Sequence, residues 1–177
     1  MYERDDKNPL AGAPSRRKVV AGFAVAFGGL LVGAEAWGKP QQPTSVDNKT
    51  RTSLHQEIEF TANPRRIYEA LLDSKQFATV TGMAAKIDSK PGGAFTTFGG
   101  MIMGRNVELI RNQRIVQAWR PASWKPGQYS VVKFELTARG HNTVLVLDHT
   151  GFPEGDFDSL GSGWPERYWE PLKKFLA

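Results

Sequence analysis

The sequence predicts an α+β fold in which a curved antiparallel sheet of about six or seven strands wraps around a long C-terminal helix. Three observations predict it. Helical signals follow the first strand and then disappear until the C-terminus, alternating apolar and polar residues mark the strands between them, and one apolar stripe marks the final helix. An antiparallel sheet must cover its apolar face, and only the final helix is long enough to do so. A strongly curved sheet that grips a helix leaves a cavity between them.

The composition fits one globular domain. The chain has 177 residues, of which 40% are hydrophobic and 11% aromatic, enough for a single core of ordinary size. Residues 1–36 hold five of the 23 basic and four of the 18 acidic side chains, so residues 37–177 carry a net charge of +4, too small to predict a nucleic-acid partner. The chain has no cysteine, which excludes disulfides, thiolate metal sites and thiol nucleophiles.

The first 36 residues have the pattern of a signal peptide. Paired arginines precede an apolar run over residues 19–32, and a small-x-small pattern follows, typical of a signal-peptidase site. The arginines are similar to a twin-arginine signal, so we expect an exported, periplasmic protein. The alternatives are an uncleaved membrane anchor, for which a run of about 14 apolar residues is short of the ~20 needed, and a buried helix. The signal residues are Arg16, Arg17, Ala34 and Ala36.

The domain is predicted to start near Ser53. Residues 37–52 contain prolines and glutamines and few apolar side chains, so they predict a flexible linker in front of a domain at 53–177. Residues 54–60 then alternate between the two faces of a strand. Asn63 followed by Pro64 is typical of a helix start. A short helix is therefore expected up to Asp73, with a further helical turn after it.

The middle of the domain is predicted to consist of strands. Glycines between residues 82 and 111 separate several short strands, where turns and strand bends explain them better than a phosphate-binding loop does. Further strands are expected at residues 114–120, 129–138 and 143–150. The last of these begins with apolar residues on both faces, so it should lie centrally in the sheet.

The closing helix is predicted from an apolar stripe at helical spacing. Its residues are Trp164, Tyr168, Leu172, Phe175 and Leu176. Pro165 is expected in the first helical turn, and Pro171 is expected to kink or divide the helix. The glycines at 161 and 163 flank a serine that lacks the context of a nucleophile elbow, and they are interpreted as a flexible lead into the helix.

These elements and several short motifs together resemble the START-like (SRPBCC) superfamily, and within it the family named after the activator of the heat-shock protein 90 ATPase. The matching stretches are residues 60–71 (FTANPRRIYEAL), 92–95 (GGAF), Gly104, 115–120 (IVQAWR), 143–152 (TVLVLDHTGF) and 163–164 (GW). The resemblance implies a helix-grip fold, often with an apolar cavity. It implies no common reaction, and many members bind hydrophobic molecules.

His149 is the titratable residue of most interest. Strand alternation places it on the same face as Leu145 and Leu147, while Asp148 points to the opposite side, so His149 and Asp148 cannot form a dyad. A neutral histidine hydrogen-bonded within the core, a ligand-orienting group and a general base remain open. His55 and His141 lie elsewhere in the sequence, so neither a metal site nor a cofactor is predicted.

Other charged groups are interpreted as surface features. The acidic loop at 154–158 lacks the spacing of a calcium-binding loop. Arg105, Arg111, Arg114 and Arg120 could form a small basic face on a hairpin, but solvent-exposed side chains are the simpler interpretation because few aromatics lie between them.

The predicted function is binding of a small hydrophobic or amphipathic molecule, lipid-like or aromatic, in the cavity. The expected cavity residues are Met101, Met103, Trp119, Phe134, Leu147, His149, Trp164 and Tyr168. Ordinary core packing is the competing role for each. A cyclase-like or hydrolase-like enzyme using the same cavity, and a protein that binds a chaperone or a folding client, are the alternative functions. No nucleic-acid partner is expected, and membrane contact only through an uncleaved signal segment.

Overall fold

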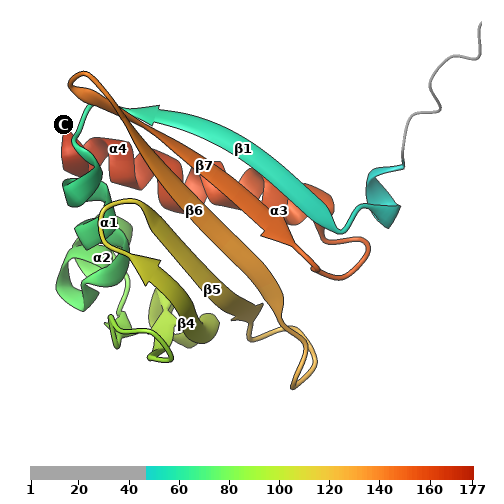
Figure 1. Cartoon of the computed structure of the whole chain (residues 1–177). Helices are drawn as coiled ribbons and strands as arrows, with labels where there is room; N and C mark the ends of the chain where they lie inside the picture. The colour runs from blue at the N-terminus through green and yellow to red at the C-terminus, as the bar shows by residue number, and fades with distance from the viewer. Residues whose placement is uncertain (1–46) are drawn as a thin grey trace, which may run out of the picture. The chain divides into compact units, whose positions relative to one another are not determined.

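The computed structural model describes residues 47–177 (Figure 1). The predicted signal peptide and the linker up to residue 46 lie outside the described residues. The start of the described part forms a short 3-10 turn, η1 (Asn48–Thr50), which is attached to the body of the domain because the backbone N–H of Gly155 donates to the Lys49 carbonyl at 2.8 Å. Within residues 47–177, no helix has both the length and the hydropathy to cross a membrane.

Seven antiparallel strands form one curved sheet in the order β1-β7-β6-β5-β4-β3-β2. The strands are β1 (Ser53–Phe60), β2 (Lys86–Ile87), β3 (Ala94–Thr97), β4 (Ile102–Ile110), β5 (Arg114–Pro121), β6 (Ser130–Arg139) and β7 (Asn142–Thr150). The chain runs through β2 to β7 as a meander, and β1 pairs with β7 at the edge. This confirms the predicted α+β helix-grip class. The last strand, expected at the centre, is instead second from the edge, between β1 and β6.

Two short helices follow β1, as predicted. They are α1 (Pro64–Leu72) and α2 (Ser74–Thr81). The side chain of Asn63 accepts a hydrogen bond from the Arg66 N–H at the start of α1, and Asp73 accepts from two backbone N–H groups at the start of α2. These caps satisfy donors that have no partner inside the first helical turn.

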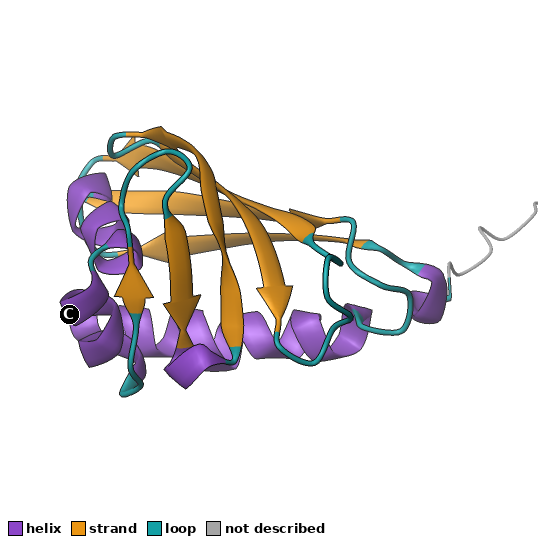
Figure 2. Cartoon of the chain, turned by 90° about the horizontal axis from the view of Figure 1, so that it is seen from below, coloured by secondary structure: helices purple, strands orange, loops and turns teal. Residues whose placement is uncertain are grey.

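A long helical segment crosses one face of the sheet (Figure 2). It consists of α3 (Phe157–Trp164), a π-helical turn η3 (Pro165–Trp169) and α4 (Glu170–Leu176). The sequence-based start near Trp164 is corrected here, because the helix begins at Phe157 and Pro165 lies in its middle. Phe157 and Leu160 pack on the core, and this burial outweighs the low helix propensity of Gly161 and Gly163.

The π turn lies between Pro165 and Pro171, so the helix is divided next to Pro171, as predicted. Pro165 also leaves one carbonyl of α3 without a backbone donor. Proline has no N–H, so the carbonyl of Gly161 lacks the donor that an α-helix places four residues later. Gln56 of β1 supplies it: its Nε2 donates to the Gly161 carbonyl at 3.0 Å, and its Oε1 accepts from Trp169 Nε1 at 2.7 Å. The N–H of Glu170 reaches the Pro165 carbonyl five residues back, the spacing of a π-helix. One side chain of the sheet therefore satisfies both the carbonyl that Pro165 leaves free and the indole N–H of Trp169.

This arrangement makes Gln56 important for stability. We expect Gln56→Leu to lower the free energy of unfolding by about 2 kcal/mol, because a carbonyl and an indole N–H both lose their partner in a half-buried site. Urea unfolding followed by circular dichroism measures it. Gln113→Leu, on an exposed turn, is the matched control and should change stability by no more than about 0.5 kcal/mol. Equal effects of the two changes would contradict this role.

Candidate functional site

A pocket of about 400 Å³ lies where the closing helix passes the end of β5. Its walls come from the turn before β4, from β5 and the loop after it, and from α3 and η3. The apolar part of the wall is formed by Phe98, Ile102, Trp119, Trp124, Trp164 and Tyr168. Ser159, Ser162, Glu166 and Arg167 add polar groups on the helix side. The pocket is thus an aromatic recess with a polar margin.

Three of the predicted residues meet in this pocket. Trp164 and Tyr168 are four residues apart on one face of the helix, with ring centroids 4.4 Å apart. Trp119 reaches the same place from β5, with its ring centroid 5.7 Å from that of Trp164. Across the sheet from Trp119 lies Gly104, where a Cβ would come within 2.5 Å of the Phe95 ring. Only glycine leaves room there for that ring and for the Ala118 carbonyl.

The turn at Phe98 is strained. Phe98 has a φ of 52° and is followed by Gly99 and Gly100 at 65° and 97°, a region that bulky side chains rarely adopt. The Phe98 ring is buried, with its centroid 5.1 Å from that of Tyr168 and 5.4 Å from that of Phe77. The aromatic contacts offset the backbone strain and fix Phe98 as a wall of the pocket.

His149 is fully buried behind the pocket wall, and its contacts determine its tautomer. Trp164 Nε1 can only donate, so His149 Nδ1, at 3.2 Å, is the acceptor. His149 Nε2 then carries the proton and donates to Ser130 Oγ at 2.7 Å, and that hydroxyl donates to the Trp119 carbonyl at 3.1 Å. Burial lowers the pKa of His149 from 6.5 to about 3. The neutral imidazole joins the helix to the sheet, and both of its nitrogens are engaged within the protein.

The other predicted residues lie outside the pocket wall. Phe134 packs below it, against Trp164 and Trp169, and Leu147 is fully buried in β7. Met101 is 42% exposed, and the sulfur of Met103 accepts a hydrogen bond from Arg120 Nη2 at 2.9 Å. The structure thus brings together Trp119, Trp164 and Tyr168 and distributes the other five over the core and the surface.

Of the apolar wall residues named above, sequence reasoning missed Phe98, Ile102 and Trp124. Trp124 lies in the loop after β5 and donates from Nε1 to Asp156 Oδ2 at 2.6 Å. That bond ties the loop to the start of the closing helix. The sequence did offer one indication of Trp124: a tryptophan in an otherwise polar loop flanked by prolines needs a packing partner. No sequence pattern predicted that Phe98 lines the pocket, since the orientation of its side chain follows from the strained turn.

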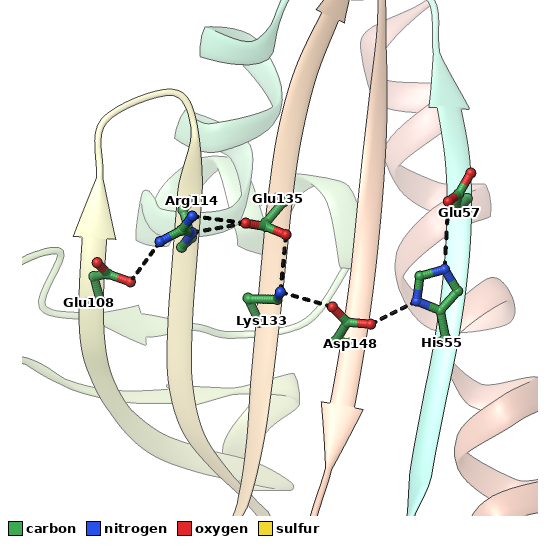
Figure 3. Close-up of polar contacts among 7 residues, drawn as sticks. All are labelled: His55, Glu57, Glu108, Arg114, Lys133, Glu135 and Asp148. Atoms are coloured by element: carbon green, nitrogen blue, oxygen red, sulfur yellow. Dashed lines mark hydrogen bonds and ion pairs between the residues drawn. The ribbon is translucent and has the colours of Figure 1, made fainter.

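The outer face of the sheet carries a chain of alternating charges (Figure 3). Its members are Glu108, Arg114, Glu135, Lys133, Asp148, His55 and Glu57. Asp148 stands at its centre, with Oδ1 2.7 Å from His55 Nδ1 and Oδ2 3.0 Å from Lys133 Nζ. The hydrogen bonds from His55 and Lys133 hold the pKa of Asp148 below its usual range, and Asp148 in turn raises the pKa of His55. The predicted separation of Asp148 from His149 is confirmed.

The charges of the β4–β5 hairpin are already largely engaged. Arg105 donates to the Gly92 carbonyl, Arg114 pairs with Glu135, and Arg120 donates to two carbonyls of the following loop. Arg114 is thus paired with a carboxylate, whereas the carbonyl contacts hold Arg105 and Arg120 in place without neutralising them. Among residues 47–177, no group of three or more His, Asp or Glu side chains is placed to hold a metal ion.

Comparison with known proteins gives a consistent result. The family model "Activator of Hsp90 ATPase homolog 1-like protein" matches residues 61–177. A Schizosaccharomyces pombe protein, C1711.08, is 28% identical over 120 residues, which cover 68% of this chain and 36% of that protein. A Dictyostelium discoideum protein named activator of 90 kDa heat shock protein ATPase homolog is 27% identical over 131 residues, covering 73% of this chain and 34% of that protein. The chain thus spans about a third of these relatives.

Solved structures share the fold. The crystal structure of PFC0360w, an HSP90 activator from Plasmodium falciparum, superposes with a TM-score of 0.68 at 25% identity, covering 71% of this chain and 96% of that one. CalU16 from Micromonospora echinospora superposes with a TM-score of 0.61 at 22% identity, covering 71% and 76%. Its sequence identity supports a shared fold alone.

The buried imidazole gives a prediction on pH. Above its ordinary pKa of 6.5, His149 is neutral in the folded and the unfolded chain and contributes no pH dependence. Below that pH the unfolded chain takes up a proton that the folded chain refuses until about pH 3. We therefore expect His149 to lower stability by about 2 kcal/mol between pH 7 and pH 5.

Nuclear magnetic resonance of ¹⁵N-labelled imidazoles measures this without a substitution. The His149 ring should keep the Nε2–H tautomer and remain neutral down to pH 4, while the exposed His55 titrates above its ordinary pKa. A His149 ring that takes up a proton near pH 6.5 would contradict the assigned hydrogen bonds.

Proposed function

Because the chain belongs to the family of activator of Hsp90 ATPase homolog 1-like proteins, whose matched region covers strands β2 to β7 and the closing helix, we propose that this protein binds a small hydrophobic or amphipathic molecule in the aromatic pocket. The observation that carries the proposal is the recess of about 400 Å³ walled by Trp119, Trp124, Trp164 and Tyr168. Its volume falls within the range of small-molecule sites, ~300 to 1,000 Å³.

The walls favour a flat, apolar ligand. Their aromatic rings are held in place before a ligand arrives, since Trp164 bonds to His149 and Trp124 bonds to Asp156. A rigid wall loses little conformational entropy on binding. Burial of about 300 Å² of ligand surface would contribute about 7 kcal/mol before the cost of association. Affinity in the micromolar range is therefore expected.

The polar margin is consistent with an amphipathic ligand. The helix side of the pocket carries four polar side chains, those of Ser159, Ser162, Glu166 and Arg167. They can form hydrogen bonds with the polar part of a ligand. Small-molecule sites commonly have apolar walls, which give affinity through burial, and a few polar groups, which fix the orientation of the ligand.

Two glycines of α3 allow a sharp test. Gly163 lines the pocket, and a Cβ added there meets no atom within 4 Å. We expect Gly163→Leu to fill the recess without disturbing the core, and to weaken binding of the neutral fluorescent probe N-phenyl-1-naphthylamine to the full chain by at least about tenfold. Fluorescence titration measures the affinity.

The control for this test is Gly161→Leu. Gly161 is in the same helix, also has open space around an added Cβ, and does not line the pocket. Both changes replace glycine by a better helix former, so neither should lower the melting temperature. The proposal fails if the probe does not bind the unaltered chain, or if the two variants bind it equally well.

A second candidate function is binding of a chaperone of the Hsp90 kind. It is supported by the names of the relatives, which describe activators of a heat shock protein ATPase, and by the superposition on 96% of the Plasmodium falciparum HSP90 activator. If a protein partner is the physiological ligand, Gly163→Leu should leave the effect of this chain on Hsp90 ATPase activity unchanged. That assay separates the two functions.

A further inference from the structure

The indole of Trp119 differs from the other tryptophans of residues 47–177. The other three donate hydrogen bonds from Nε1: Trp124 to Asp156, Trp164 to His149 and Trp169 to Gln56. Trp119 is only 4% exposed, yet its Nε1 has no hydrogen-bond partner among the described residues. Buried indole N–H groups nearly always have one, because a buried donor without an acceptor is unfavourable.

Thr97 and Tyr168 add further polar groups at the same place. The hydroxyl of Thr97 is buried and also has no partner among residues 47–177. The Tyr168 phenol lies within reach of both groups: burial raises its pKa, and weak hydrogen-bond contacts with Trp119 and Thr97 lower it by a smaller amount. Neither contact meets the distance and angle of a hydrogen bond, because Trp119 Nε1 and Thr97 Oγ1 both lack a partner among residues 47–177. The phenol therefore stays protonated at neutral pH and can donate.

Two of these groups line the aromatic pocket, and the third lies next to it. Trp119 and Tyr168 belong to the pocket wall, and Tyr168 shares with Thr97 the wall of a neighbouring void of about 10 Å³. Trp119 can only donate, and the two hydroxyls can donate or accept. A ligand atom that accepts hydrogen bonds would therefore satisfy Trp119 Nε1–H and could also accept from either hydroxyl.

The charge of the lining favours a neutral ligand. Asp156 and Glu166 contribute two carboxylates and Arg167 one guanidinium, so an anion would meet an excess of negative charge. The size limits the ligand as well. A dry cavity of about 150 Å³ accepts one benzene ring, so about 400 Å³ has room for two or three fused rings.

We infer that the pocket is built for a neutral aromatic molecule that bears a carbonyl oxygen, which accepts hydrogen bonds from Trp119 Nε1–H and the Tyr168 hydroxyl while its rings lie among Trp119, Trp164 and Phe98. The inference rests on the proposed ligand binding and specifies its chemistry. It assigns Trp119 and Tyr168 as specificity-determining residues and leaves His149 a structural role.

The test compares two probes of equal shape. 2-Acetylnaphthalene carries a carbonyl, and 2-ethylnaphthalene replaces it by a methylene group. Their dissociation constants are measured by tryptophan fluorescence on the full chain and on Trp119→Phe, which keeps an aromatic ring and removes the N–H. The ratio of the two constants is compared between variants, which cancels the difference in hydrophobicity between the two probes. We expect Trp119→Phe to reduce the preference for the ketone by about tenfold, and Tyr168→Phe to reduce it similarly.

Trp124→Phe is the matched control. It removes an indole N–H from the same pocket, but one that already donates to Asp156. In this variant the affinities for the two probes should change together, and their ratio should stay within twofold of that of the unaltered chain. Thr97→Val, close in shape to threonine, should reduce the ratio less than Trp119→Phe. Melting temperatures identify any variant that fails to fold.

Each outcome decides between the two proposals. Binding of both probes with a ratio that Trp119→Phe and Tyr168→Phe leave unchanged overturns the inference and leaves the proposed function in place. Binding of neither probe overturns the inference, and the proposed function is then decided by the titration with N-phenyl-1-naphthylamine. A preference for 2-naphthoate over the ketone overturns the neutral-ligand requirement, because the lining should repel that anion.

Discussion

The neutral imidazole of His149 is the contact on which the pocket depends. It accepts from Trp164 on the closing helix and donates to Ser130 on β6, whose hydroxyl donates to the Trp119 carbonyl on β5. One buried side chain thus fixes three elements relative to one another, and every polar hydrogen along the way has an acceptor. The series of bonds ends at the backbone of Trp119. Its indole N–H remains outside the series, on the side of the pocket.

The surroundings of the pocket depart from ideal local structure in several places. Pro165 interrupts the helix, the chain adopts a π turn, and Gln56 replaces the missing backbone donor. Phe98 adopts a left-handed conformation that its ring packing stabilises. Such departures cluster at functional sites in proteins whose remaining sequence agrees with its fold. The outer face of the sheet, in contrast to the surroundings of the pocket, has regular strand alternation and regular ion pairs.

The sequence was sufficient for most of the fold and for part of the site. Strand periodicity and the capping signals at Asn63 predicted the elements, because each depends on neighbours in the chain. The start of the closing helix was missed because Gly161 and Gly163 have low helix propensity, while the burial of Phe157 and Leu160 depends on the sheet. His149 was assigned to the inward face correctly. Its role follows from Ser130 and Trp164, and no local pattern shows that these side chains meet.

We propose that a ligand binds in the recess beside Trp119. The indole region of a ¹H–¹⁵N correlation spectrum tests it most directly, since each tryptophan gives one separate signal. On addition of 2-acetylnaphthalene to the full chain, the Trp119 Nε1–H signal should shift downfield as it gains an acceptor, while the signal of Trp169, bonded to Gln56, stays in place. An unchanged Trp119 signal at saturating probe would contradict the account.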